Sequence, residues 1–197
     1  MKNRMSIKSK IKELTFFLSN FWNAAVKKIK GISTGENVKL RGKIYFFGNG
    51  KLDIGANTVI NSGVIANPVG GNRTTFYIIN GAQIKLGDNC GISNSTICAA
   101  TGIVIGNRSI IGGNCCLYDT DFHSVDYMER RNKPDTGIMT APICIGEDVF
   151  IGANSTILKG VTIGDRSIVA SGSVVTKSIP SDQLWGGNPA KKIRDLM

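Results

Sequence analysis

A six-residue spacing of aliphatic residues constrains the fold of this chain more than any other feature. From residue 145 onward, every sixth residue is Ile or Val, and a Gly or Ala follows four of the six. An amphipathic helix repeats every 3.6 residues and an alternating strand every two, so neither gives this spacing. A short strand followed by a turn does, with one bulky side chain per repeat pointing into a narrow prism. The positions in phase are Ile145, Ile151, Ile157, Ile163, Val169 and Val175.

The same period returns upstream in three shorter blocks. Three six-residue sides make one coil of about 18 residues, and successive coils pair as parallel strands about 4.8 Å apart. The 24 glycines suit the corners of such coils, because Gly adopts left-handed backbone conformations without a steric penalty. We therefore predict an all-β fold, a parallel β-helix. The upstream blocks are Ile54/Ile60, Leu86/Ile92/Cys98 and Ile105/Ile111/Leu117.

Three segments interrupt or flank the repeat and set the predicted organisation. Residues 1–30 form a helical appendage, and residues 31–180 form the β-helix domain. Residues 118–142 contain no hexapeptide and are predicted to be a loop inserted between two regular blocks, where function is often located. Residues 181–197 are expected to cross the last coil and end in a short helix beginning near Pro189.

The net charge of +10 is concentrated in the appendage. Residues 1–30 hold eight Lys or Arg and one Glu, a net of +7, which leaves +3 for the remainder. The remainder has no interleaved basic and aromatic residues, so we predict no nucleic-acid partner. Ile7, Ile11, Leu14 and Leu18 have helical spacing. Two interpretations remain open: a helix that caps the first coil, or one that contacts an anionic membrane surface.

The cysteine pattern indicates a reducing compartment. The five cysteines are odd in number and form no CxxC pair, and the N-terminus lacks a secretory pattern. No apolar run reaches the length of a membrane-spanning helix. We expect a cytoplasmic protein, with peripheral contact at the inner face of the membrane as an open possibility.

The single histidine, His123, lies within the inserted loop and is the candidate general base. Imidazole titrates near neutral pH and accepts a proton from a hydroxyl group. Asp119 and Asp121 precede it by four and two residues, and either carboxylate is placed to accept the second ring N–H. We favour Asp121 slightly over Asp119.

The repeat resembles that of the hexapeptide-repeat proteins, which implies a left-handed β-helix over about residues 36–180. The stretch from His123 to Arg130 resembles the loop of the maltose and galactoside acetyltransferases, although Ser124 replaces their Pro. In that family the histidine is the general base on a sugar hydroxyl, which attacks the thioester of acetyl-coenzyme A directly. The Asp-x-Asp-x-His pattern of residues 119–123 is more similar to acetyltransferases of surface polysaccharides.

Residues 150–194 are similar, without gaps, to the coenzyme-A-binding end of these enzymes. The resemblance implies that the backbone N–H of Ala153 binds the thioester carbonyl and then the oxyanion. It places Ser171 beside the pantetheine arm, and Thr176, Lys177 and Arg194 beside the phosphates and adenine of the coenzyme. Cationic side chains suit this polyanionic cofactor.

For the acceptor sugar, we expect Asn94 and Arg130 to supply hydrogen bonds, although Asn94 also suits a structural ladder inside the β-helix. The resemblance further implies a homotrimer in which His123 of one subunit faces Ala153 of the next. A thin prism offers no concave pocket of its own, which favours a cleft between subunits.

The predicted function is acetyl-coenzyme-A-dependent O-acetylation of a sugar or surface-polysaccharide precursor, with no metal. N-acetylation of an amino sugar uses the same base and coenzyme and is the main alternative; a non-catalytic β-helix scaffold is another. The hydratases of the γ-class carbonic anhydrase type bind zinc through three histidines, and this chain has one.

Overall fold

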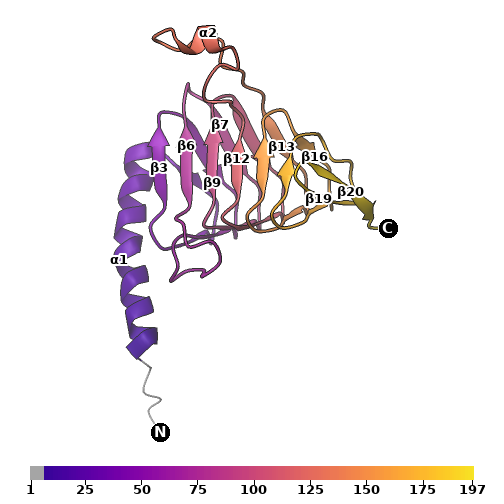
Figure 1. The fold of residues 1–197 in the computed structure, drawn as a ribbon. Coiled ribbons are helices and arrows are strands. Elements are labelled where there is room, and N and C mark those ends of the chain that lie inside the picture. Colours follow the sequence, from indigo (N-terminus) through magenta and orange to yellow (C-terminus); the bar gives the residue numbers. More distant parts are fainter. Residues whose placement is uncertain (1–6) are drawn as a thin grey trace.

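The computed structural model describes residues 7–197, so the first six residues of the predicted appendage lie outside the described residues. One long helix, α1 (Ile7–Lys30), precedes a triangular prism of stacked coils (Figure 1). The coils form three sheets, parallel except for the last strand of the second, here called faces 1, 2 and 3 in the order in which the chain visits them. The predicted hexapeptide-repeat fold, a left-handed β-helix, is confirmed.

Each face is a ladder of short strands from successive coils. Face 1 comprises β1 (Ser33–Thr34), β4 (Lys51–Ile54), β7 (Gln83–Leu86), β10 (Gly102–Ile105), β13 (Ile143–Ile145) and β16 (Thr162–Ile163). Face 2 comprises β2 (Lys39–Arg41), β5 (Val59–Asn61), β8 (Gly91–Ser93), β11 (Ile110–Gly113), β14 (Phe150–Ile151), β17 (Ile168–Val169), β19 (Gln183–Gly187) and β20 (Ala190–Asp195). Face 3 comprises β3 (Tyr45–Gly48), β6 (Thr75–Ile78), β9 (Thr96–Ala99), β12 (Cys116–Tyr118), β15 (Thr156–Leu158) and β18 (Val174–Val175).

The aliphatic residues of the period stack inside the prism as columns, one column per face. On face 3, for example, Leu117 pairs in register with Ile157, and both side chains are fully buried. Burial of these columns is the main source of stability, because each coil supplies a side chain to its neighbours above and below.

One predicted position in this pattern is wrong. Cys98 was expected in the column with Leu117, but the residue in register with Leu117 is Ile97, and Cys98 pairs with Tyr118 on the outer side. Ile92 and Ile97 are five residues apart instead of the regular six, which moves the phase by one. Cys98 is nevertheless buried, at 1% exposure.

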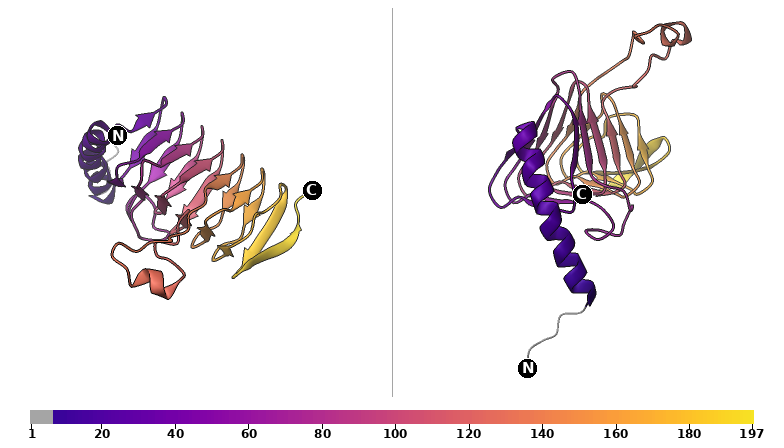
Figure 2. Two further views of the ribbon diagram at one scale, coloured as in Figure 1. Left: turned by 90° about the horizontal axis from the view of Figure 1, so that it is seen from above. Right: turned by 90° about the vertical axis from the view of Figure 1, so that its left-hand side faces the viewer.

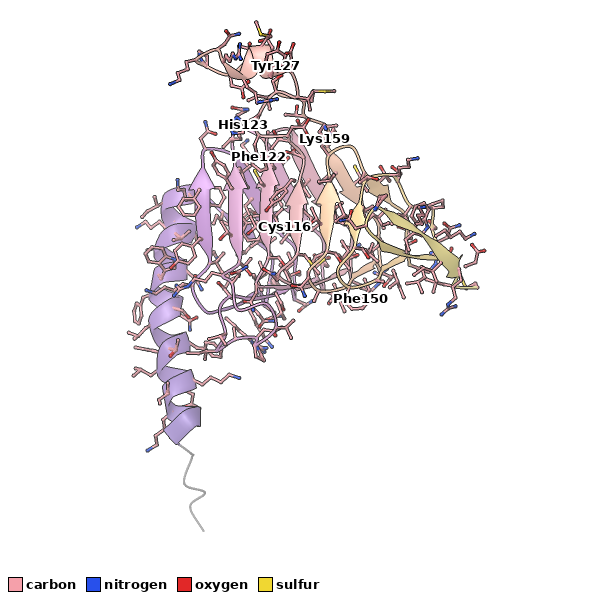
Figure 3. The ribbon with its side chains drawn as sticks, viewed as in Figure 1. Cys116, Phe122, His123, Tyr127, Phe150 and Lys159 are labelled. Carbon is pink, nitrogen blue, oxygen red and sulfur yellow. The ribbon has the colours of Figure 1, made fainter. Side chains whose placement is uncertain are left out.

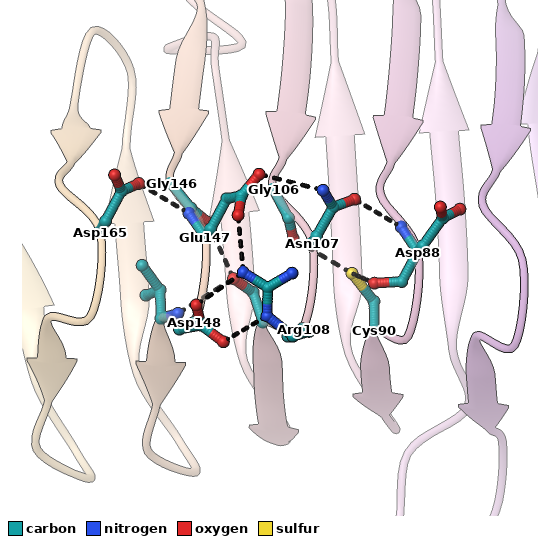
Figure 4. Close-up of polar contacts among 11 residues, drawn as sticks. Asp88, Cys90, Gly106, Asn107, Arg108, Gly146, Glu147, Asp148 and Asp165 are labelled. Atoms are coloured by element: carbon teal, nitrogen blue, oxygen red, sulfur yellow. Dashed lines mark hydrogen bonds and ion pairs between the residues drawn. The ribbon is translucent and has the colours of Figure 1, made fainter.

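The corner between faces 1 and 2 shows how polar side chains join the coils (Figure 4). The Asp165 carboxylate accepts the backbone N–H of Glu147 at 2.8 Å, and the Asn107 amide donates to Glu147 at 3.0 Å. Arg108 makes an ion pair with Asp148 at 2.7 Å. Arg108 holds the pKa of the Asp148 carboxyl below its ordinary value, through a hydrogen bond and its positive charge.

The C-terminal segment is a hairpin, so the predicted short helix near Pro189 is wrong. Strand β19 adds to face 2 beside β17 and pairs antiparallel with β20. Pro189 lies with Asn188 in the turn of this hairpin, which follows Gly187 with φ of +101°. The last coil leaves an unpaired strand edge, and the chain end pairs with that edge instead of forming a helix.

Candidate active site

The inserted loop leaves the prism at the corner between faces 3 and 1, after β12, and returns at β13 (Figure 1). Its two ends form a short antiparallel neck. The Asp121 N–H donates to Met139 O at 3.0 Å, and the Ala141 N–H donates to Asp119 O at 2.9 Å. Thr120 and Thr140 pair between them. The neck holds the rest of the loop above the corner.

Asp119 attaches the neck to the preceding coil. Its carboxylate is fully buried and accepts three backbone N–H groups, from Ala100 at 2.7 Å, Thr101 at 2.8 Å and Gly102 at 2.7 Å. Three such bonds replace the water that an ionised carboxylate loses on burial. The Asp119 carboxylate therefore binds the backbone of the corner at residues 100–102 and is not placed to orient His123.

Asp121 attaches the neck to the following coil. Its carboxylate accepts from Lys159 Nζ at 2.7 Å, and Lys159 follows β15 on the same corner (Figure 3). Neither predicted aspartate is recorded in contact with the imidazole among the described residues, so the expected pairing with Asp119 or Asp121 is wrong. The spacing of two and four residues suggested proximity, but the neck turns both carboxylates toward the prism.

The partner of His123 is Asp135, from the returning half of the loop. His123 Nδ1 lies 2.9 Å from Asp135 Oδ2, and the same carboxylate is within 3.4 Å of the Ser124 N–H. The Asp135 side chain is 15% exposed, whereas the His123 side chain is 74% exposed. When the carboxylate accepts the Nδ1 proton, Nε2 carries a lone pair. Sequence reasoning missed Asp135 because the twelve-residue fold-back that brings it to His123 has no periodic signal.

Arg130 supports the backbone around His123. Its Nη1 donates to Ser124 O at 2.7 Å and to Val125 O at 2.9 Å. The arginine lies at the end of α2 (Tyr127–Arg130), a single turn capped by the Asp126 carboxylate. Arg130, expected to bind the acceptor, is thus engaged in holding the segment that carries the histidine.

The groups at the base of the loop do not offer an alternative base. Burial and the nearby Asp119 raise the pKa of the Cys98 thiol to about 11. Burial and Cys116 raise the pKa of the Tyr118 hydroxyl to about 12. Both groups remain protonated at neutral pH, and Phe122 packs edge-on against the Tyr118 ring with centroids 5.2 Å apart.

Ala153 and Ser171, the predicted partners of the thioester and pantetheine, lie one above the other at the corner between faces 2 and 3. The Ala153 carbonyl accepts the N–H of Gly172 at 2.8 Å. Within residues 7–197 the Ala153 N–H has no recorded acceptor, so this amide is available to an external oxygen. A backbone amide fixed in a rigid corner is a preorganised donor.

The predicted phosphate-binding residues lie elsewhere. Thr176 and Lys177 follow β18, where the chain passes from face 3 toward face 1, and both side chains are exposed. Arg194 lies on β20, also exposed, with Nη1 3.2 Å from Asp195 O. One chain therefore does not gather the five predicted cofactor residues at a single corner.

Asn94 lies at the corner between faces 2 and 3 and is buried, at 1% exposure. Its amide donates to Asn67 O and Val69 O, both at 2.7 Å, and its oxygen accepts the Gly63 N–H at 2.7 Å. The prediction that Asn94 binds the acceptor conflicts with this geometry, because all its principal hydrogen-bonding groups already hold the loop that follows β5.

Within one chain, His123 and Ala153 lie at opposite ends of face 3. The loop follows the end of β12, whereas Ala153 precedes the start of the neighbouring parallel strand β15. A three-residue strand alone spans about 10 Å. A base and an oxyanion donor at this distance do not act on one reacting carbonyl.

Known proteins with the same six-residue repeat are similar to this chain in sequence. Residues 142–177 match the family model described as the hexapeptide repeat of succinyl-transferase. The galactoside O-acetyltransferase of Escherichia coli is 36% identical over 121 residues, which cover 61% of this chain and 58% of that protein. The chain spans only part of the length of the curated relatives it matches, 60%, 48% and 58% of three of them.

Solved structures share the fold over almost the whole chain. A hexapeptide-repeat acetyltransferase of Vibrio cholerae, complexed with acetyl coenzyme A, superposes with a TM-score of 0.61 at 25% identity, covering 99% of this chain and 92% of that one. An N-acyltransferase of Bacillus cereus, complexed with an amino-sugar nucleotide and coenzyme A, gives a TM-score of 0.68 at 21% identity, covering 89% of each chain.

The stacked coils and the matching motif define the class: this is a left-handed β-helix protein of the hexapeptide-repeat type. Within that class, the chain is similar to hexapeptide-repeat acetyltransferases, in agreement with the resemblance seen in its sequence.

Proposed function

We propose that the protein is an acetyl-coenzyme-A-dependent O-acetyltransferase that modifies a hydroxyl group of a saccharide. The observation that carries this proposal is the His123–Asp135 pair, with the ring exposed and its Nδ1 held at 2.9 Å. Similarity to a galactoside O-acetyltransferase supports the choice of a hydroxyl acceptor.

The chemistry follows from these groups. His123 Nε2 takes the proton from the acceptor hydroxyl as its oxygen attacks the thioester carbonyl, and Asp135 stabilises the imidazolium that forms. The Ala153 N–H binds the oxyanion of the tetrahedral intermediate. When the carbon–sulfur bond breaks, the imidazolium returns the proton to the thiolate of coenzyme A, which leaves as the free thiol.

The active site is assembled between two copies of the chain in a homotrimer. The geometry supports this, because the loop and Lys177 lie toward one edge of face 3 and Ala153 with Ser171 lie at the other. When the edge of face 3 that carries the loop in one copy lies against the edge that carries Ala153 in the next copy, His123 and the Ala153 N–H come together. Coenzyme A binds along this junction, with Ser171 beside the pantetheine arm and Thr176, Lys177 and Arg194 toward the phosphates.

The test is acetyl transfer by the purified protein to a panel of saccharides and amino sugars. We expect O-acetylated product, and His123→Ala to lower kcat by about 10²- to 10⁴-fold, the usual contribution of a general base. Coenzyme A should raise the Tm of wild type and variant equally, because the base does not hold the cofactor.

Three outcomes contradict the proposal. Full activity of His123→Ala overturns the role of the histidine, and acetylation restricted to amines overturns the hydroxyl acceptor. A monomeric mass at assay concentration, measured by light scattering on an active sample, overturns the site between copies.

A further inference from the structure

Helix α1 has one side that faces the prism and an opposite side that is exposed. The side facing the prism is anchored by specific contacts: Trp22 Nε1 donates to Ile44 O at 2.8 Å, and Asn23 exchanges hydrogen bonds with Gly42 and Ile44 at 2.9 and 3.0 Å. Asn23 is 4% exposed. This side closes the open end of the first coil, as the first coil of a β-helix requires.

The opposite side of α1 is apolar, and none of the described residues covers it. Residues three, four and seven apart share one side of a helix, and the spacing from Leu14 to Leu18 and Phe21 follows this rule. Phe17 packs edge-on against Phe21, with centroids 5.0 Å apart, without covering it. The N-terminal part of the helix also extends past the prism (Figure 2). The uncovered set is Ile11, Leu14, Phe17, Leu18 and Phe21, each 54% to 64% exposed.

The charges of α1 favour an anionic surface over a second copy of the chain as the partner of the exposed apolar side. Residues 7–30 contain six lysines and one acid, Glu13, and the lysines form two groups at the two ends of the apolar stretch. Bringing such helices of two or three copies together would place like charges side by side, which is unfavourable. An anionic bilayer meets both features, because lysines pair with lipid phosphates while Phe and Leu enter the interface.

We propose that α1 anchors the protein to an anionic membrane surface, lying in the plane of the interface with its outward apolar side in the lipid. The helix is then both a cap and an anchor, one role on each side. No helix among residues 7–197 is long and apolar enough to cross a bilayer, so the contact is interfacial.

The experiment is co-sedimentation of the full chain with vesicles of phosphatidylcholine alone and of phosphatidylcholine with phosphatidylglycerol. We expect binding to the anionic vesicles only, weakened by salt because lysines contribute. The double variant Leu14→Gln/Phe21→Gln should lower the partition coefficient at least about tenfold. A matched variant, Val104→Gln/Ile110→Gln, removes exposed aliphatic side chains on β10 and β11, away from α1, and should bind like wild type.

Failure of wild type to bind anionic vesicles, or unchanged binding by Leu14→Gln/Phe21→Gln, overturns the proposal. Light scattering tests the alternative that α1 contacts a second copy of the chain. If wild type does not bind vesicles and Leu14→Gln/Phe21→Gln has a lower oligomeric mass than wild type, the surface is an interface between copies. Melting curves confirm that the variants are folded. Acetyl transfer to a soluble saccharide should be the same with and without vesicles, so this test is independent of the proposed reaction.

Discussion

The stacked coils and the inserted loop, residues 119–142, are stabilised in different ways. In the coils, each buried side chain packs between equivalents above and below, as Phe76 does beside Phe46. In the loop, the stabilising contacts are single polar pairs such as His123–Asp135 and Arg130–Ser124. The repeat therefore fixes where the loop starts and ends, whereas local hydrogen bonds fix the position of the His123 imidazole.

The largest expected effect is on the coils. Phe76→Ala removes a fully buried ring and should lower the free energy of unfolding by about 3–5 kcal/mol, because the rigid columns cannot close the cavity. Chemical denaturation measures this change. The control Phe47→Ala removes a neighbouring ring that is 53% exposed and should cost far less. Equal losses would contradict the assignment of stability to the interior columns.

The second largest loss of stability is expected for a substitution in the neck, where the loop joins the coils. Asp119→Asn replaces a buried carboxylate that accepts three N–H groups with an amide, and we expect a loss of about 1–3 kcal/mol in the free energy of unfolding. Asp126→Asn is the control, since Asn caps a helix as well as Asp does. A stability of Asp119→Asn indistinguishable from wild type would show that the carboxylate does not anchor the neck.

Within the loop, a substitution should affect catalysis and leave stability unchanged. Asp135→Asn keeps the shape but removes the charge beside the imidazole, so kcat should fall about 10- to 100-fold, part of the general-base contribution. Asp135→Glu retains the charge and should recover part of the loss. If both variants melt like wild type and retain full kcat, Asp135 has no part in positioning the base.

The smallest effect is expected at the exposed corner ion pair. The folded pKa of Asp148 is lowered by Arg108, so its stabilising contribution is present above the ordinary value of 3.8 and is lost as pH falls through the folded pKa. Arg108→Gln should therefore be less stable than wild type at pH 7, with the difference shrinking below pH 4. Denaturation at both pH values measures it; a constant difference would contradict the pairing.

The sequence predicted the repeated coils, but it did not predict the contacts made where the inserted loop and the C-terminal segment fold back on the chain. Period six gave the prism and its interior columns because each position is determined by its neighbours one coil away. The period placed Cys98 in the interior column because Cys98 is six residues after Ile92. The residue that occupies the column is Ile97, because this side of the coil has five residues instead of six.

The site was predicted in part for the same reason. His123 was chosen as the candidate base because it is the single histidine and lies in the one long break. Its partner was not, because the neck directs Asp119 and Asp121 to backbone amides and a lysine, which depends on tertiary geometry. The C-terminal hairpin was missed because pairing with an open strand edge overrides local helix preference.

The neck also has an evolutionary consequence. Because Asp119 and Asp121 fasten it to two successive coils, residues 122–138 form a cassette whose length and sequence are free of the hexapeptide period. Insertions there leave every interior column intact. Exchange of this one surface segment therefore changes the surroundings of His123, while the corner that carries Ala153 and Ser171 stays under the constraint of the coils.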